Sequence, residues 1–232
     1  MAISPIKTLA QFPHNVTNIS VFGSYARGDN DASSDFDLIV VVKDGFGTVL
    51  ESVIKERIEL LFNLHPSISF YGEKKILDML QNGHLFAWHL FMESFPVSNF
   101  RHISEQFGKP DKYTDFVADC EGLHRILKDT SAKSKSFPEN FIFDMGILYV
   151  CARNIAMSAS SALYDEYYFG RYSPFQMSDI EFPISKEDYT LMMQCRMAST
   201  RGMSPPSSLK NTVVDDAKQL TEWSEMVLKR IR

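Results

Sequence analysis

The sequence predicts an α+β fold in which a first part of alternating strands and helices precedes a helical second part. Three observations lead to this prediction. Short apolar runs alternate with helical patterns up to about residue 100, a polar stretch with Gly108 and Pro110 follows, and helical periodicity then continues through the remaining residues. We therefore expect one domain at residues 1–107 and a second, helical domain at residues 108–232.

Short strands are expected in the first part at residues 18–22, 35–42 and 67–71. The second of them contains the continuous apolar run 38–42, which is typical of a buried strand. Apolar residues recur at helical spacing over residues 49–64, and His65-Pro66 ends that pattern. Further helices are expected at residues 73–81 and 84–92, followed by a short extended segment at 94–97.

The second part is predicted to consist of helices at residues 115–128, 141–163, 186–199 and 209–231, with a loop at 131–138. The last helix carries one apolar stripe, which should pack against the other helices. Its members are Val213, Ala217, Leu220, Ser224, Val227 and Ile231.

Composition excludes several classes of protein. Hydrophobic residues make up 44% and charged residues 23%, which is typical of a globular domain. The net charge of −5 argues against a large nonspecific nucleic-acid surface. The three cysteines form no Cys-x-x-Cys pair, so we expect core residues rather than a zinc site or disulfides. No signal-type run and no stretch of about 18 apolar residues is evident, so we expect a cytoplasmic protein without a membrane partner.

Two aspartates one residue apart open the apolar strand at residues 35–42. Because side chains at positions i and i+2 of a strand share a face, Asp35 and Asp37 should project together. Neighbouring carboxylates repel each other unless a cation lies between them. Mg²⁺ is commonly held by one or two carboxylates together with substrate phosphates. Asp35 and Asp37 are therefore candidate metal ligands and catalytic residues.

A Gly-Ser pair precedes the aspartates at the end of the first expected strand. Gly23 has no Cβ, so a phosphate can approach its backbone closely. If Ser24 begins a short helix, the free N–H groups there favour an anion. Together with the aspartates, these residues predict a metal–triphosphate site. Arg27 follows one short turn later and is expected either to contact the phosphates or to order the loop by pairing with Asp29 or Asp31.

The same stretch resembles the signature of the DNA polymerase β-like nucleotidyltransferase superfamily, which is Gly-Ser, a variable loop and Asp-x-Asp. The fuller form, Gly-Ser-x-Ala-Arg-Gly followed by Ser-Asp-x-Asp-Leu, is typical of small bacterial and aminoglycoside nucleotidyltransferases. Its positions all match here, at Gly23, Ser24, Ala26, Arg27, Gly28, Ser34, Asp35, Asp37 and Leu38. The resemblance implies a small mixed sheet with helices, Mg²⁺ as cofactor, and ATP or another nucleoside triphosphate as substrate. It also implies a helical domain that contacts the acceptor.

The sequence departs from this superfamily at one point. Most active members carry a third carboxylate on the next core strand, where this chain has serines at positions 67 and 69. Three explanations remain open. In the first, another acid supplies the third carboxylate, with Glu93 as the first candidate and Glu73 as the second. In the second, the aspartate pair and the triphosphate hold a single metal ion. In the third, the domain binds nucleotide without transferring it. For Glu93 the alternative is an ordinary surface acid at a helix end.

Arg153 is a charged residue within the apolar helix expected at residues 141–163. The helix around it is apolar on almost every side, and a buried guanidinium needs a partner. That partner is expected to be structural, with Asp119 or Asp144 as candidates, or else the triphosphate or the acceptor. A neighbouring aromatic cluster is expected either to bind a ligand by stacking or to join a loop to the core; it comprises Tyr164, Tyr167, Tyr168, Arg171 and Tyr172.

The sequence therefore predicts a Mg²⁺-dependent nucleotidyltransferase that moves a nucleoside monophosphate, with AMP from ATP as the favoured case, onto a hydroxyl. The expected acceptor is a small molecule or a protein, and the net charge disfavours nucleic acid. The alternative is a catalytically weakened pseudoenzyme that binds nucleotide and acts as a sensor or partner-binding module. The missing third carboxylate is the feature that favours this alternative.

Overall fold

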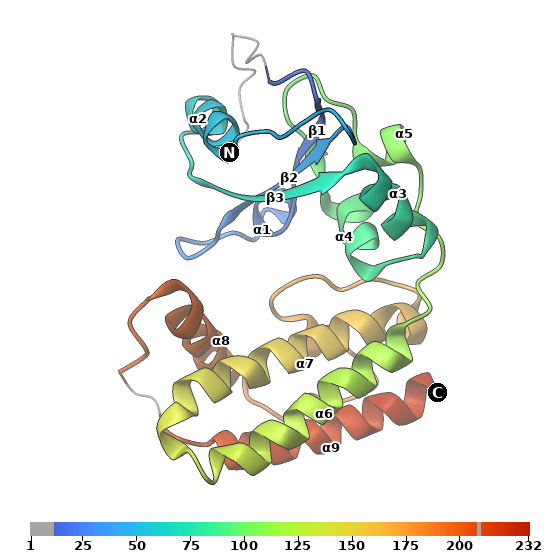
Figure 1. Cartoon of the computed structure of the whole chain (residues 1–232). Coiled ribbons are helices and arrows are strands. Elements are labelled where there is room, and N and C mark those ends of the chain that lie inside the picture. The colour runs from blue at the N-terminus through green and yellow to red at the C-terminus, as the bar shows by residue number, and fades with distance from the viewer. Residues whose placement is uncertain (1–11, 208–209) are drawn as a thin grey trace. The chain divides into compact units, whose positions relative to one another are not determined.

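The structure is a computed structural model, and it describes residues 12–207 and 210–232. The chain divides into two compact units, Met1–Tyr113 and Thr114–Arg232, which are described separately below. Figure 1 shows strands with helices in the first unit and helices in the second, so the expected α+β fold is confirmed.

The sheet of the first unit is small and mixed. It has the strand order β3-β2-β1-β4, in which β1 is antiparallel to both β2 and β4, and β2 is parallel to β3. Each strand lies within two residues of its expected bounds. The strands are β1 (Val16–Val21), β2 (Phe36–Val42), β3 (Pro66–Gly72) and β4 (Phe95–Pro96).

Five described helices accompany this sheet. They are α1 (Ser24–Arg27), α2 (Glu51–Phe62), α3 (Glu73–Gln81), α4 (Leu85–Glu93) and α5 (Ile103–Phe107). Helix α5 was not expected from the sequence, because its five residues are too few for a helical period to stand out.

Alternate residues of β2 contribute to two different cores. Leu38 and Val40 pack in a cluster with residues of α2, whereas Ile39 and Val41 pack in a second cluster with residues of α3, α4 and α5. Figure 1 accordingly shows α2 on one side of the sheet and α3 and α4 on the other. Asp37 shares its side of β2 with Ile39 and Val41, because side chains alternate along a strand. Asp37 therefore lies on the side of α3 and α4.

The second unit is a bundle of helices around one apolar core. Its long helices are α6 (Phe116–Ser134), α7 (Phe141–Tyr164), α8 (Lys186–Arg201) and α9 (Val213–Ile231), with short 3₁₀ turns η1 (Pro138–Asn140) and η2 (Ser173–Gln176). α7 packs against α6, α8 and α9. The expected stripe of α9 is confirmed, because all six of its members are buried. Cys120, Cys151 and Cys195 are also buried, as expected.

The end of α6 and the beginning of α9 differ from the boundaries expected from the sequence. The loop expected at residues 131–138 is partly wrong, because α6 continues to Ser134. The hydroxyl of Thr130 donates to the carbonyl of Ile126 at 2.8 Å, so this polar side chain is satisfied inside the helix and both Thr130 and Ser134 are buried. The start expected at residue 209 for the last helix lies outside the described residues, and α9 begins at Val213.

One segment of the described chain is long and apolar enough to cross a membrane by length and composition, namely Pro138–Tyr164, contrary to the expectation that no such stretch is present. Half of its apolar window is buried by the rest of the protein. A helix at the centre of a bundle is also apolar on all sides. The packing of α7 against three neighbouring helices therefore gives its composition a structural reason.

Candidate functional site

The two aspartates lie at the beginning of β2. Asp37 is the second residue of this strand and Asp35 directly precedes it, and both side chains are partly exposed. The N–H of Phe22 donates to the carbonyl of Asp37 at 3.1 Å, which continues the pairing of β1 with β2 by one residue. The chain that leaves β1 therefore turns directly beside Asp37.

Gly23 makes this turn in a conformation that only glycine adopts readily. Its φ is 73° and its ψ is −148°. A Cβ at this position would lie 2.9 Å from Oδ2 of Asp37, closer than real Cβ contacts allow. The absence of a side chain at Gly23 therefore brings the backbone of the Gly-Ser turn against the carboxylate of Asp37.

Ser24 begins a single helical turn, α1, which is the condition under which the sequence predicts an anion site here. The N–H of Arg27 donates to the carbonyl of Gly23 at 3.0 Å, and Gly28 ends the turn in the left-handed conformation. The side chain of Ser24 is buried. N–H groups at the start of a helix have no partner within it, so this turn presents donors to an approaching anion.

The loop between α1 and β2 is ordered by its own side chains. The carboxylate Oδ1 of Asp31 accepts from the N–H and hydroxyl of Ser33 and from the hydroxyl of Ser34. The N–H of Asp31 donates in return to the hydroxyl of Ser34 at 2.8 Å. These contacts close a compact turn immediately before Asp35 and so define where the first aspartate enters the site.

Arg27 forms the loop-ordering ion pair that the sequence analysis considered, and its partner is Asp29, with Nε to Oδ2 at 3.2 Å. A second partner was not anticipated: Nη1 of Arg27 lies 2.7 Å from Oε2 of Glu93 at the end of α4. His89 contacts the same oxygen through Nε2 at 2.8 Å. The sequence analysis missed the role of His89, although its i, i+4 spacing from Glu93 on one helix is a signal that could have found it.

No acid occupies the strand position where the superfamily signature leads one to expect a third carboxylate. Ser67 is the neighbour of Asp37 in the parallel pairing of β2 with β3. The second candidate, Glu73, follows Gly72, whose neighbour is Val42 at the opposite end of β2. Five strand positions separate the two rungs, or about 16 Å at the usual rise per residue. Glu73 therefore lies away from the aspartates.

Glu93 enters from the same end of the sheet as the aspartates. Val21 pairs with both Leu38 of β2 and Phe95 of β4. Glu93 directly precedes the segment that leads into β4, so it lies near the turn that follows β1. Glu93 thus contacts Arg27, which ends α1. The Gly-Ser turn beside Asp37 lies at the beginning of the same short helix.

The chemistry of the donors suits a magnesium ion that is shared with a ligand. No group of three or more His, Cys, Asp or Glu side chains that could hold a metal is found in the part of the chain that the structure describes. Asp35 and Asp37 supply hard carboxylate oxygens, which fit Mg²⁺ when phosphate oxygens and water complete its coordination. A Cβ on Gly23 would lie 2.9 Å from Oδ2 of Asp37, so the backbone of the Gly-Ser turn lies directly beside one of these carboxylates.

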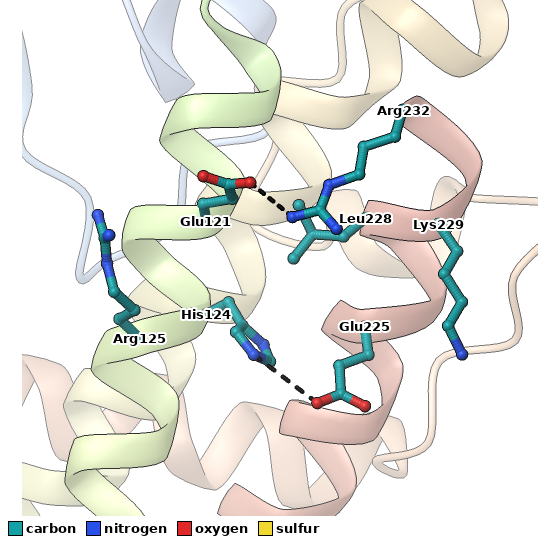
Figure 2. Close-up of a pocket in the computed structure, with 7 residues that line it drawn as sticks. All are labelled: Glu121, His124, Arg125, Glu225, Leu228, Lys229 and Arg232. Atoms are coloured by element: carbon teal, nitrogen blue, oxygen red, sulfur yellow. Dashed lines mark hydrogen bonds and ion pairs between the residues drawn. The ribbon is translucent and has the colours of Figure 1, made fainter.

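The helical unit contains a pocket of about 380 Å³ between α6 and the end of α9, shown in Figure 2. Acidic and basic groups pair across it. Arg232 Nη2 lies 2.5 Å from Glu121 Oε1, and His124 Nε2 lies 3.8 Å from Glu225 Oε1. These contacts link α6 to α9, and none of the sequence-predicted site residues lines this pocket.

Arg153 has a structural environment, but not the partner that was expected. Its Nη2 donates to the carbonyl of Phe169 at 2.9 Å and its Nε to that of Gly170 at 3.4 Å. The segment after α7 therefore satisfies this cation through backbone oxygens, in place of Asp119 or Asp144.

The aromatic cluster next to Arg153 joins this same segment to the core. The rings of Tyr172 and Tyr189 lie 6.0 Å apart, and the hydroxyl of Tyr189 donates to the carbonyl of Arg171. Tyr172 also bonds to Thr190 of α8 through its hydroxyl. These contacts support the structural interpretation of the cluster.

Comparison with known proteins points to the same part of the chain. Residues 4–84 match the family model of the nucleotidyltransferase domain. The matched range contains the Gly-Ser turn, both aspartates and the whole of β3, and it ends before Glu93. No curated protein matches the chain.

Proposed function

We propose that this chain, whose N-terminal part is a nucleotidyltransferase domain of the DNA polymerase β-like superfamily, transfers AMP from ATP, or another nucleoside monophosphate, to a hydroxyl group. One observation carries the proposal. The Gly-Ser turn packs so closely against Asp37 that a Cβ on Gly23 would lie 2.9 Å from Oδ2 of this residue and would displace its carboxylate. A phosphate cradled by this turn would lie beside the carboxylates that hold the metal.

Each residue has a distinct part in the proposed reaction. Asp35 and Asp37 would hold Mg²⁺, which would neutralise charge on the triphosphate. The backbone of Gly23 and Ser24 supports the phosphates, and Arg27 adds a positive charge. The acceptor oxygen forms a bond to the α-phosphorus, the bond from this phosphorus to the oxygen that bridges to the β-phosphate breaks in line with it, pyrophosphate leaves, and the proton of the hydroxyl passes to water. Positioning and charge neutralisation therefore supply most of the rate enhancement.

We propose a small molecule or a protein in the cytoplasm as the acceptor. The net charge of −5 supports this class over nucleic acid, because a chain that tracks phosphates usually carries a basic surface. By analogy with the superfamily, the helical unit is the proposed source of acceptor contacts.

A second candidate function is nucleotide binding without transfer. The observation in its favour is Ser67, which occupies the position next to Asp37 where an acid is expected. A domain of this kind would retain the Gly-Ser turn and the aspartate pair and would act as a sensor or partner-binding module.

The test measures pyrophosphate release from each of the four nucleoside triphosphates with Mg²⁺ and a panel of acceptors. Thermal denaturation with and without nucleotide measures binding in parallel, because a ligand of the folded state raises the melting temperature. An Asp35→Asn/Asp37→Asn double variant removes the proposed metal ligands. Asp78→Asn is the matched control, because Asp78 is an exposed acid of α3 paired with Lys75.

Release that requires the aspartate pair but not Asp78 would support the transferase. Stabilisation by nucleotide without release under any condition would support the binding module. Release or stabilisation that is unchanged in the double variant would overturn the site, since Asp35 and Asp37 would then have no part in it.

A further inference from the structure

The guanidinium of Arg27 is held from two sides. Nε contacts Asp29 in the following loop at 3.2 Å, and Nη1 contacts Glu93 of α4 at 2.7 Å. The side chain of Asp29 is 48% exposed, whereas those of Arg27 and Glu93 are only 16% and 15% exposed. Because water screens an exposed pair more strongly, Glu93 is the partner that matters for the position of Arg27.

His89 fixes Glu93 in turn. Its Nε2 lies 2.8 Å from the carboxylate oxygen that also accepts from Arg27, and its side chain is 12% exposed. The imidazole packs edge-on against the ring of Phe22, with 5.7 Å between the ring centroids. Phe22 directly precedes Gly23. His89 therefore ties the carboxylate of Glu93 to the segment that enters the Gly-Ser turn.

The placement of Glu93 is poorly suited to a catalytic base. β4 lies two strands away from β2 in the sheet, which corresponds to about 10 Å between their backbones. Strand β1 lies between β2 and β4, and the Gly-Ser turn follows β1. Burial would raise the pKa of Glu93, but hydrogen bonds from His89 and Arg27 lower that pKa below its usual range. A base that works near neutral pH needs a raised pKa instead.

Part of the Arg27 guanidinium remains available. A guanidinium has five N–H groups, of which Arg27 uses one on Nε and one on Nη1. Within residues 12–207 and 210–232, Nη2 has no hydrogen-bonding partner. A mostly buried cation whose Nη2 is free within the described part of the chain, one helical turn from the Gly-Ser pair, can donate hydrogen bonds to a triphosphate oxygen.

We propose that Glu93 and His89 are positioning residues that hold the guanidinium of Arg27 against the triphosphate. This pair is called the Arg27 clamp below. The inference rests on the proposed function, since it assumes that a nucleoside triphosphate occupies the Gly-Ser turn. It assigns Glu93 a role in nucleotide binding in place of the role of a base.

The experiment measures the Kd of Mg²⁺–ATP by titration calorimetry for the wild type and for Glu93→Gln, Arg27→Gln and the double variant. Loss of a hydrogen bond to a charged group costs about 1.5–3 kcal/mol, so we expect Arg27→Gln to weaken binding about 10- to 150-fold. Glu93→Gln should weaken binding about tenfold. The double variant should bind no more weakly than Arg27→Gln alone, because the Arg27 clamp acts only through Arg27.

Two controls separate the possible failures. Glu59→Gln removes another glutamate–histidine contact, the exposed one between Glu59 of α2 and His65, which follows that helix; this variant should leave the Kd unchanged. Asp37→Asn tests the proposed function itself. If the wild type binds no triphosphate, or if Asp37→Asn binds as well as the wild type, the proposed function is wrong.

If Asp37→Asn loses binding while Glu93→Gln keeps the wild-type Kd, only the Arg27 clamp is wrong. A large fall in turnover with an unchanged Kd would then assign Glu93 the role of the base. If the effects of Glu93→Gln and Arg27→Gln add in the double variant, Glu93 acts by a route other than Arg27, and the inference is also overturned.

Discussion

Replacing Gly23 with alanine perturbs the candidate site at the point where the Gly-Ser turn meets Asp37, the proposed metal ligand. The φ of 73° with a ψ of −148° belongs to a region that is occupied almost only by glycine, and a side chain there costs about 1–3 kcal/mol. The new Cβ would also lie 2.9 Å from Oδ2 of Asp37. Moving that carboxylate out of its rotamer costs a further 0.5–1.5 kcal/mol, roughly.

The two effects together should lower the free energy of unfolding by about 2–4 kcal/mol. For a chain of this length each kcal/mol corresponds to about 2–4 °C, so the melting temperature should fall by about 4–16 °C. The displacement of Asp37 has a second consequence. The stabilisation by Mg²⁺–ATP that we propose for the wild type should be lost, because the carboxylate would no longer lie where the proposed metal site requires it.

Gly28→Ala is the matched control for this variant. Gly28 also has a positive φ, of 76°, but a Cβ there would meet no atom within 4 Å. Alanine at this position should cost about 1–2 kcal/mol from the left-handed conformation alone and should keep the stabilisation by Mg²⁺–ATP. Thermal denaturation with and without Mg²⁺–ATP measures both quantities. If Gly23→Ala retains the full stabilisation by nucleotide, the contact with Asp37 has no functional weight and the reasoning fails.

Three further predictions concern the helical unit. Arg153→Met should lower the free energy of unfolding by about 1.5–3 kcal/mol in urea denaturation, because the carbonyls of Phe169 and Gly170 lose a charged donor; an unchanged stability would show that these bonds contribute nothing. Burial, assisted by the charge of Lys128, lowers the pKa of His124 below its usual 6.5. The contribution of His124 to stability is therefore fully present above pH 6.5 and is lost as the pH falls below it, since the unfolded chain takes up the proton first. As the pH is lowered from about 8 to about 5, the melting temperature should consequently fall less steeply for His124→Gln than for the wild type. Parallel curves of melting temperature against pH would contradict this. Burial raises the pKa of two thiols to about 12 and of the third to about 11, so a thiol reagent at about pH 8 should label the protein only after denaturation; the three are Cys120, Cys151 and Cys195.

Local patterns in the sequence predict most of the fold. The strands, the helix at residues 73–81 and the apolar stripe of α9 follow from periodicity, since the side chains that define each element lie within a few residues of one another. The boundary at the end of α6 does not, because hydroxyl groups at Thr130 and Ser134 are typical of loops and become compatible with a helix only when they bond to the preceding turn.

The sequence by itself predicted the candidate metal–triphosphate site. Gly23, Ser24, Asp35 and Asp37 lie close together along the chain, and the chemistry of glycine and carboxylate at that spacing is legible without coordinates. Even there, the left-handed φ of Gly23 and its contact with Asp37 of the neighbouring strand, which together disfavour a side chain, are visible only in the structure.

Only the tertiary structure decided the partners of the isolated charges. Arg27 and Glu93 are 66 positions apart, and no local pattern pairs them. Strand register separates Glu93, near the Gly-Ser turn, from Glu73 at the other end of β2, although both were candidates by residue type. Arg153 is satisfied by backbone carbonyls, which every residue carries and which the sequence therefore does not mark. Charge pairing depends on distances of a few ångströms between distant segments, and these distances exist only once the chain has folded.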